Sequence, residues 1–246
     1  MRFWIDRACL KEGYFLIKDD LYHHICRVCK IQKGEHFELF CEGLQKYEVF
    51  LDSLSKTQAL AKIVKSYPVP PLKKPYLNLA VSLPRMTTFE SLIEYSVQLG
   101  VKQIQPFFSE FSFFRKESEF KKSRFKRWNK IIQHHLALTG RTQTLQIQKP
   151  VSLSQIQIPS DHVVFIAYEG SKKNLKELSS SFEKKFEFPN EIWIFIGSEG
   201  GFSLRELQAF QKTCSSSKFF SMGEQILKVE TAGLFALSLL KYHYDV

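Results

Sequence analysis

A glycine loop at residues 196–206 is the part of the sequence best suited to hold a small molecule. An apolar run at 192–196 predicts a strand that enters the loop, and Ser203 with Glu206 has the S-x-x-E spacing of a capping box, which predicts a helix from Ser203. Glycines lack a Cβ, so a ligand can approach the free backbone N–H groups there. The candidate contacts in this loop are Ile196, Gly197, Gly200 and Gly201.

A second segment, residues 222–232, has the same organisation. A short apolar strand around Phe219 and Phe220 runs into Gly223, and an apolar helix follows over 232–240. One such loop is also explained by turn shape alone, but two of them in one domain favour a binding site. Neither has the spacing of a Walker loop or of a G-x-G-x-x-G loop. The candidate contacts here are Met222, Gly223, Ile226, Leu227 and Ala232.

Two glycine loops can meet only if the strands before them lie in one sheet. After residue 76, apolar runs and helical periodicity alternate, with a strand at 101–105 that we expect Pro106 to stop. Strands that alternate with helices predict an α/β domain with a mostly parallel sheet and helices on both faces. The other predicted elements are strands at 77–83, 163–167, 192–196 and 218–221 and helices at 88–99 and 120–139.

The first part of the chain has a different pattern. Closely spaced strands at 36–40, 47–51 and 59–64, with one helix at 20–28, predict a small barrel. Four prolines within residues 67–75 predict a stiff extended linker. We therefore expect two domains, 1–70 and 73–246.

The net charge of +10 suits a polyanionic partner. A basic segment at 115–130 also carries aromatic residues, so it is either an RNA contact or a solvated helix face. No segment is long and apolar enough to span a bilayer, and the first residues lack a signal-peptide core, which predicts a cytoplasmic protein without a membrane partner.

The five cysteines have no disulfide-framework spacing, which fits a reducing compartment. Cys26 and Cys29 follow His23 and His24, but a second ligand pair at zinc-site spacing is missing. We expect the two cysteines on the buried face of a helix and no metal site.

Together the two glycine segments resemble the paired signatures of the small-subunit ribosomal RNA uridine-N3 methyltransferases (RsmE), a family in the SPOUT class of S-adenosylmethionine (SAM) enzymes. The family forms are I-G-P-E-G-G-[FL]-[ST]-x-x-E and L-G-x-R-I-L-R-x-E-T-A. The likeness covers essentially the whole chain, including residues 24–28, 99–106 and Gly140-Arg141.

The resemblance implies an N-terminal PUA-like RNA-binding barrel (1–70), a SPOUT methyltransferase domain with a C-terminal trefoil knot (73–246) and a homodimer. SAM would contact the residues named above, and the substrate would be a uridine of 16S ribosomal RNA, free or in the assembled subunit. The implied RNA contacts are Arg2, Arg27, Arg115, Lys121, Lys122, Arg124 and Arg127.

For catalysis, Glu199 is either the base that removes the N3 proton, which would need burial to raise its pKa, or a brace for the loop. Arg141 and Lys228 would stabilise negative charge on the uridine. Some polar positions depart from the family pattern, which leaves open a non-catalytic RNA-binding protein or a methyltransferase for another RNA. The departures are Gln98, Phe111, Ala137, Leu138, Ser198, Gln225 and Lys228.

Overall fold

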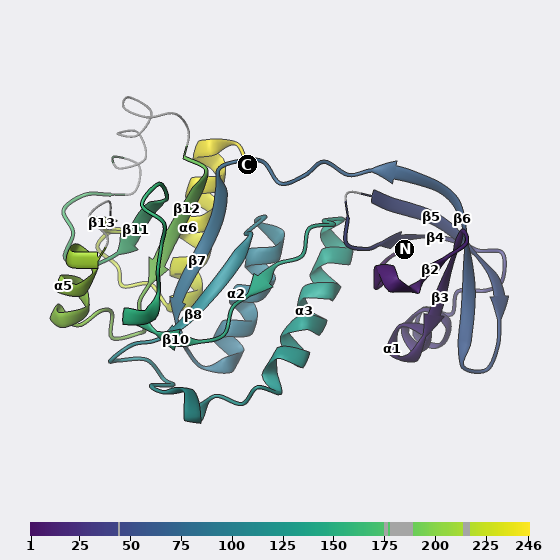
Figure 1. The fold of residues 1–246 in the computed structure, drawn as a ribbon, viewed down its shortest axis with the longest axis horizontal. Coiled ribbons are helices and arrows are strands. Elements are labelled where there is room, and N and C mark those ends of the chain that lie inside the picture. Colours follow the sequence, from purple (N-terminus) through teal and green to yellow (C-terminus); the bar gives the residue numbers. More distant parts are fainter. Residues whose placement is uncertain (44, 175–176, 178–188, 214–216) are drawn as a thin grey trace. The chain divides into compact units, whose positions relative to one another are not determined.

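The computed structural model describes residues 1–43, 45–174, 177, 189–213 and 217–246. They fall into two compact units, Met1–Pro71 with Ile132–Thr144, and Leu72–Ile131 with Leu145–Val246. The first unit contains a curled sheet and the second a parallel sheet covered by helices, so the chain has a mixed α/β fold (Figure 1).

The first unit is built on a six-stranded sheet in the order β1-β4-β5-β6-β3-β2. Only the β1–β4 pair is parallel, and irregular register between β5 and β6 bends this sheet. Phe15, Ile17, Leu39 and Val49 alternate along their strands into one core. The strands are β1 (Arg2–Trp4), β2 (Leu10–Lys11), β3 (Tyr14–Lys18), β4 (His36–Phe40), β5 (Gln45–Leu54) and β6 (Gln58–Pro68), and η1 (Arg7–Cys9) is a 3₁₀ turn.

The helix expected at residues 20–28 is present as α1 (Asp19–Tyr22), which continues into the π-helical turn η2 (His23–Val28). Ile25 is buried, and Cys26 and Cys29 pack against the core, as predicted for a buried helix face. Burial raises the pKa of the Cys26 thiol. Within the described residues, no group of three or more His, Cys, Asp or Glu side chains could hold a metal ion.

The second unit contains a seven-stranded sheet in the order β10-β8-β7-β12-β11-β13, with β9 also beside β8. All of its strand pairs are parallel, which confirms the sheet predicted from the alternation of strands and helices. The strands are β7 (Tyr76–Ser82), β8 (Gln103–Phe108), β9 (Gln146–Ile147), β10 (Val151–Ser152), β11 (Val163–Ala167), β12 (Glu191–Ile196) and β13 (Ser217–Phe220).

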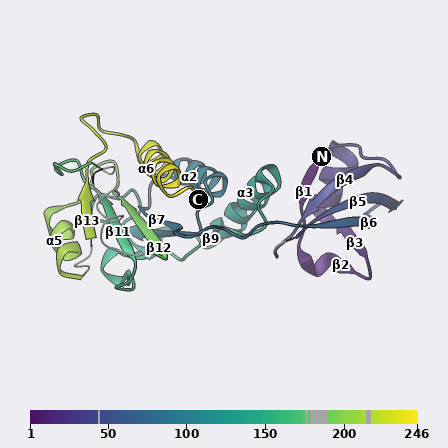
Figure 2. The ribbon, with the colours of Figure 1, turned by 90° about the horizontal axis from the view of Figure 1, so that it is seen from above.

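Helices cover both faces of this sheet. Figure 2 shows α2 and α6 on one side of the strands and α5 on the other. Trp193 and Phe195 of β12 pack with Phe210 of α5, and Ile194 between them is buried on the opposite face. The helices are α2 (Met86–Gln98), α3 (Arg124–Thr139), α5 (Leu204–Thr213) and α6 (Val229–Tyr244), with 3₁₀ turns η3 (Glu117–Glu119) and η4 (Leu153–Gln155). No described helix has the length and apolar character to cross a membrane.

Several expected boundaries are shifted, among them the end of β6 at Pro68 rather than Val64, and two of the shifts are informative. Strand β8 does not stop at Pro106 but continues to Phe108, because β9 and β10 pair only with residues on either side of Pro106 and the missing N–H breaks no bond there. Helix α3 begins at Arg124 rather than at Phe120, which follows η3 and packs its ring against Trp128.

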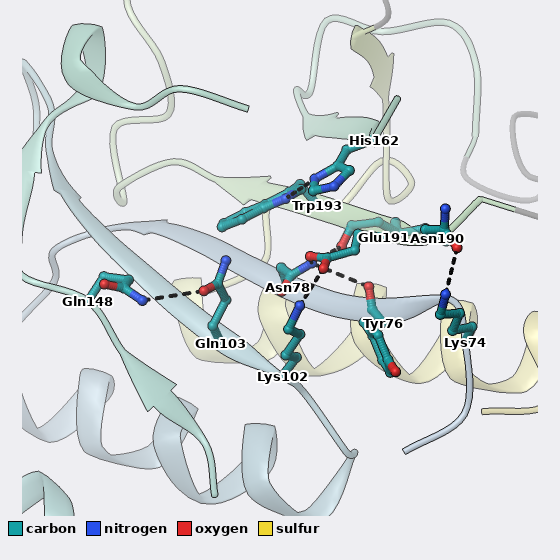
Figure 3. A network of polar contacts seen from close by, with 11 residues as sticks. Lys74, Tyr76, Asn78, Lys102, Gln103, Gln148, His162, Asn190, Glu191 and Trp193 are labelled. Atoms are coloured by element: carbon teal, nitrogen blue, oxygen red, sulfur yellow. Dashed lines mark hydrogen bonds and ion pairs between the residues drawn. The ribbon is translucent and has the colours of Figure 1, made fainter. Parts of the chain in front are cut away.

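A polar network joins the strands at their amino ends (Figure 3). Asn78 of β7 is fully buried, and its side-chain amide donates a hydrogen bond of 3.0 Å to Glu191 of β12. Lys102, just before β8, forms an ion pair with the same carboxylate. This network fixes the three central strands to one another at the end opposite the glycine loops.

Candidate functional site

Three loops at the carboxyl ends of adjacent strands line one pocket. Strand β11 lies between β12 and β13, so the loops that follow these strands meet at one edge of the sheet. All nine residues expected to contact a small molecule line this pocket, and Glu199 lines it too. The two glycine segments are therefore close together and leave a cavity between them.

The first glycine loop closes on itself. Gly201 N donates to Ser198 O at 2.9 Å, and a Cβ at Gly197 would meet the Gly201 carbonyl carbon at 2.9 Å. No side chain fits at Gly197 without moving the backbone of the loop. Ser198, at the position of the family proline, is buried, and its hydroxyl lies 3.4 Å from the Gly201 carbonyl oxygen. This contact holds the turn where the family uses a stiff residue.

Positive φ angles fix two further glycines in the pocket. Gly201 has φ +70° and Gly223 has φ +113°, in the region that L side chains rarely adopt. A Cβ at Gly201 would also meet a carboxylate oxygen of Glu169 at 3.2 Å, whereas nothing lies within 4 Å of one at Gly223. Gly201 is thus constrained both by its backbone conformation and by its neighbour.

The predicted capping box is present at the start of α5. Glu206 accepts a hydrogen bond from Ser203 N at 2.8 Å, and Glu206 N donates to the Ser203 hydroxyl at 3.3 Å. The second oxygen of the Glu206 carboxylate accepts a bond from Glu110 N at 3.0 Å. One side chain therefore connects the glycine loop to the loop that follows β8.

Replacing Glu206 with alanine should lower the free energy of unfolding by about 1–3 kcal/mol, because two backbone N–H groups lose a charged acceptor. Denaturant-induced unfolding measures this loss. Glu206→Gln keeps an acceptor oxygen and should lower the free energy of unfolding less than Glu206→Ala does. The neighbouring exposed Arg205→Ala should change stability by less than about 0.5 kcal/mol. Equal stability of Glu206→Ala and Arg205→Ala would contradict this role.

The three residues expected to act in catalysis differ in burial and in their relation to the pocket. Glu199 is exposed at the pocket, so the burial needed for a base is not provided by this chain alone. Lys228 is exposed at the N-cap position of α6, and Arg141 is a buried residue of the first unit. Burial lowers the pKa of Arg141 to about 10, so it remains charged at neutral pH. Neither cation is among the described residues that line the pocket.

Most residues expected to contact RNA are exposed, but several are engaged within the protein. Arg127 makes a two-pronged ion pair with Glu90, at 2.5 and 2.7 Å, and Arg2 pairs with Glu38 at 2.9 Å. Arg27 lies over the Tyr22 ring and Arg124 over the Phe114 ring. Exposed residues of this set are Arg2, Arg27, Arg115, Lys121, Lys122 and Arg127. Their role in binding stays a prediction.

Sequence reasoning missed the end of β11 and the loop after it, which contribute Ala167, Tyr168 and Glu169 to the pocket. These residues carry no motif. Only their position could have indicated a role, because they lie at the carboxyl end of a buried parallel strand, where ligand sites form. With them, the charged side chains among the described lining residues are Glu169 and Glu199, both acidic.

The fold and this pocket define an α/β protein with a ligand site at the carboxyl ends of a parallel sheet. A family model described as an RNA methyltransferase domain matches residues 71–241. The chain therefore belongs to the RNA methyltransferase domain family, and the resemblance seen in its glycine loops is confirmed.

Similar proteins extend over nearly the whole chain. Ribosomal RNA small subunit methyltransferase E of Mesomycoplasma hyopneumoniae is 27% identical over 239 residues, which cover 96% of this chain and 97% of that protein. The crystal structure of methyltransferase E from Neisseria gonorrhoeae bound to S-adenosyl methionine has a TM-score of 0.83 at 21% identity, covering 98% of each chain. A methyltransferase from Legionella pneumophila in complex with SAM has a TM-score of 0.86 at 22% identity, covering 98% of this chain and 96% of that one.

Proposed function

We propose that this protein uses SAM to methylate N3 of a uridine in 16S ribosomal RNA. The observation that supports this most is the single pocket in which three carboxyl-end loops gather all nine expected cofactor contacts. The similar proteins from Neisseria gonorrhoeae and Legionella pneumophila are bound to SAM in their solved structures. Methyltransferases E of several bacteria supply the substrate class.

The pocket residues fit SAM in shape and in charge. The missing Cβ atoms at Gly197, Gly200 and Gly201 let the loop pack closely against its neighbours, and the three glycines place main-chain groups in the pocket wall. The acidic Glu169 and Glu199 favour a cationic ligand, and SAM carries a sulfonium. When bound, SAM supplies an activated methyl group.

The protein's own part in the reaction is to position the uridine, exclude water and handle one proton. Ile196, Met222, Ile226 and Leu227 would form the apolar walls of the pocket. We assign Glu199 to accept the N3 proton, and the bound RNA must then shield this exposed side chain from water. If Glu199 only braces the loop, Glu199→Gln retains activity. Lys228 and Arg141 would stabilise the charge that develops on the uridine oxygens.

We further propose that the curled sheet of residues 1–70 is a PUA-like RNA-binding barrel and that residues 73–246 form a SPOUT domain with a trefoil knot. The path after β13 supports the knot. It runs beside the segment after β11, where Ser221 N donates to Lys173 O at 2.8 Å, before α6 packs on β7 and β12. We also propose a cytoplasmic homodimer that acts on the RNA or on the assembled subunit. Light scattering tests the dimer.

A calorimetric titration with SAM and mass spectrometry of ribosomal RNA test this function. We expect one SAM site per chain in the purified protein. RNA from a strain lacking the gene should lack one N3-methyluridine in the small subunit, and the wild-type gene should restore it. Absence of SAM binding would exclude the enzyme and leave an RNA-binding protein, whereas a missing mark in another RNA would correct the substrate.

A further inference from the structure

The loop after β8 exposes aromatic side chains beside the pocket. Phe111 is 46% exposed and Phe113 is 54% exposed, although phenylalanine is usually buried. Their exposure does not come from a loosely packed loop, because Ser112 between them is buried. This segment thus directs two large apolar rings to solvent at fixed positions.

Buried hydroxyls hold the backbone of the loop. The Ser112 oxygen accepts a hydrogen bond from Ser109 N at 3.0 Å and lies 2.6 Å from the Phe114 carbonyl oxygen. The Ser109 hydroxyl lies 2.6 Å from that of Ser82 at the end of β7. The bond from Glu110 N to Glu206 adds a tether to α5. Because the backbone is already fixed, a ligand that stacks on the rings loses little free energy in ordering them.

Phe111 contacts a residue of the pocket wall, although it does not itself line the pocket. A Cβ at Gly200 would meet Phe111 Cβ at 3.1 Å and its ring at 3.3 Å, so the side chain packs over this glycine. Gly200 lines the proposed SAM site. A planar group stacked on Phe111 would therefore sit next to the methyl donor.

Cations accompany these rings. The Arg85 guanidinium lies 5.4 Å from the Phe113 ring centroid, and that of Arg124 lies 5.5 Å from the Phe114 ring centroid. Arg85 and Arg115 are exposed. Exposed aromatic rings next to arginines match unpaired nucleotides, whose bases stack on the rings while their phosphates pair with the cations.

We propose that Phe111 and Phe113 form a stacking platform for unpaired bases of the RNA substrate, with Phe111 positioning the base to be methylated and Phe113 an adjacent one. This inference rests on the proposed function and names the form of RNA that the site takes. Paired bases hide their faces within the helix, so the platform selects single-stranded or flipped-out nucleotides.

The test compares Phe111→Ala and Phe113→Ala with the wild-type chain. Fluorescence anisotropy measures affinity for a short oligouridylate, and tritiated SAM measures methyl transfer to small subunits from a strain lacking the gene. Each alanine variant should lose roughly 5- to 100-fold in oligouridylate affinity, and Phe111→Ala should also lower kcat. The corresponding tryptophan variants should retain binding, because they keep an aromatic face. Tyr242→Ala, which removes an 89% exposed ring on α6, should match the wild type.

SAM affinity measured by calorimetry without RNA separates the two proposals. If the wild type binds SAM and methylates RNA but both alanine variants keep wild-type oligouridylate affinity and kcat/KM, the platform is refuted while the enzyme stands. Equal affinity for a duplex of the same length, or loss of binding in the tryptophan variants as well, would also refute stacking. If the wild type binds no SAM, the enzyme itself fails.

Discussion

Replacing Gly201 with valine is expected to weaken SAM binding about 100-fold while both units remain folded. A β-branched residue is strained at φ +70°, and its Cβ would lie 3.2 Å from a Glu169 oxygen. The loop must open, which withdraws main-chain groups from the ligand. Losing two hydrogen bonds of about 1.5 kcal/mol each lowers the affinity roughly 100-fold. Calorimetric titration with SAM measures this loss.

Gly13 provides a matched control for this substitution. It has a similar φ of +86°, and nothing lies within 4 Å of its Cβ position. It lies in the turn between β2 and β3, in the other unit from the pocket. Gly13→Val should therefore cost about 1–2 kcal/mol of stability through the same backbone strain but leave SAM affinity unchanged. Wild-type affinity in Gly201→Val, or equal losses in the two variants, would refute the assignment of the loop.

The largest expected loss of stability comes from Trp128→Ala. The Trp128 side chain is 1% exposed and packs against three phenylalanine rings, with centroid distances of 4.5 Å to Phe89, 5.4 Å to Phe120 and 5.1 Å to Phe125. Alanine leaves a cavity among these rings and should lower the free energy of unfolding by about 3–5 kcal/mol. Denaturant-induced unfolding with constant m-values checks the size of this effect.

Phenylalanine at the same position is the informative control. The Trp128 indole N–H is buried without a hydrogen-bond partner among the described atoms, so Trp128→Phe removes an unsatisfied donor while it keeps an aromatic ring. Trp128→Phe should lower the free energy of unfolding much less than Trp128→Ala does. If Trp128→Ala unfolds at the wild-type denaturant concentration, this cluster does not anchor the start of α3.

Local patterns in the sequence predicted much of this fold because their physical causes are local. Alternation of apolar residues gave β4 at residues 36–40, and the S-x-x-E spacing gave the start of α5. The prediction that Pro106 ends a strand was wrong, because the cost of a proline in a strand depends on its partner strand, which lies far away in the sequence.

The candidate site was predictable only in part for the same reason. Glycine loops can be recognised from residue type alone, so both glycine segments of the pocket could be predicted from the sequence. Glu169 enters the pocket because β11 lies between β12 and β13, and strand order is a non-local property that periodicity does not encode. Similarly, the motif around Arg141 gave no sign that its side chain is buried.

The shared carboxylate of Glu206 has a thermodynamic consequence. It holds Ser203 N at the glycine loop and Glu110 N beside Phe111, so displacement of one loop alters the hydrogen bonds of the other. Linkage between two ligands is reciprocal. Suppose that binding of the nucleic acid shifts this carboxylate and changes the affinity for the methyl donor by some factor. Binding of the methyl donor must then change the affinity for the nucleic acid by the same factor. The two substrates would then bind cooperatively or anticooperatively through one side chain that does not line the pocket.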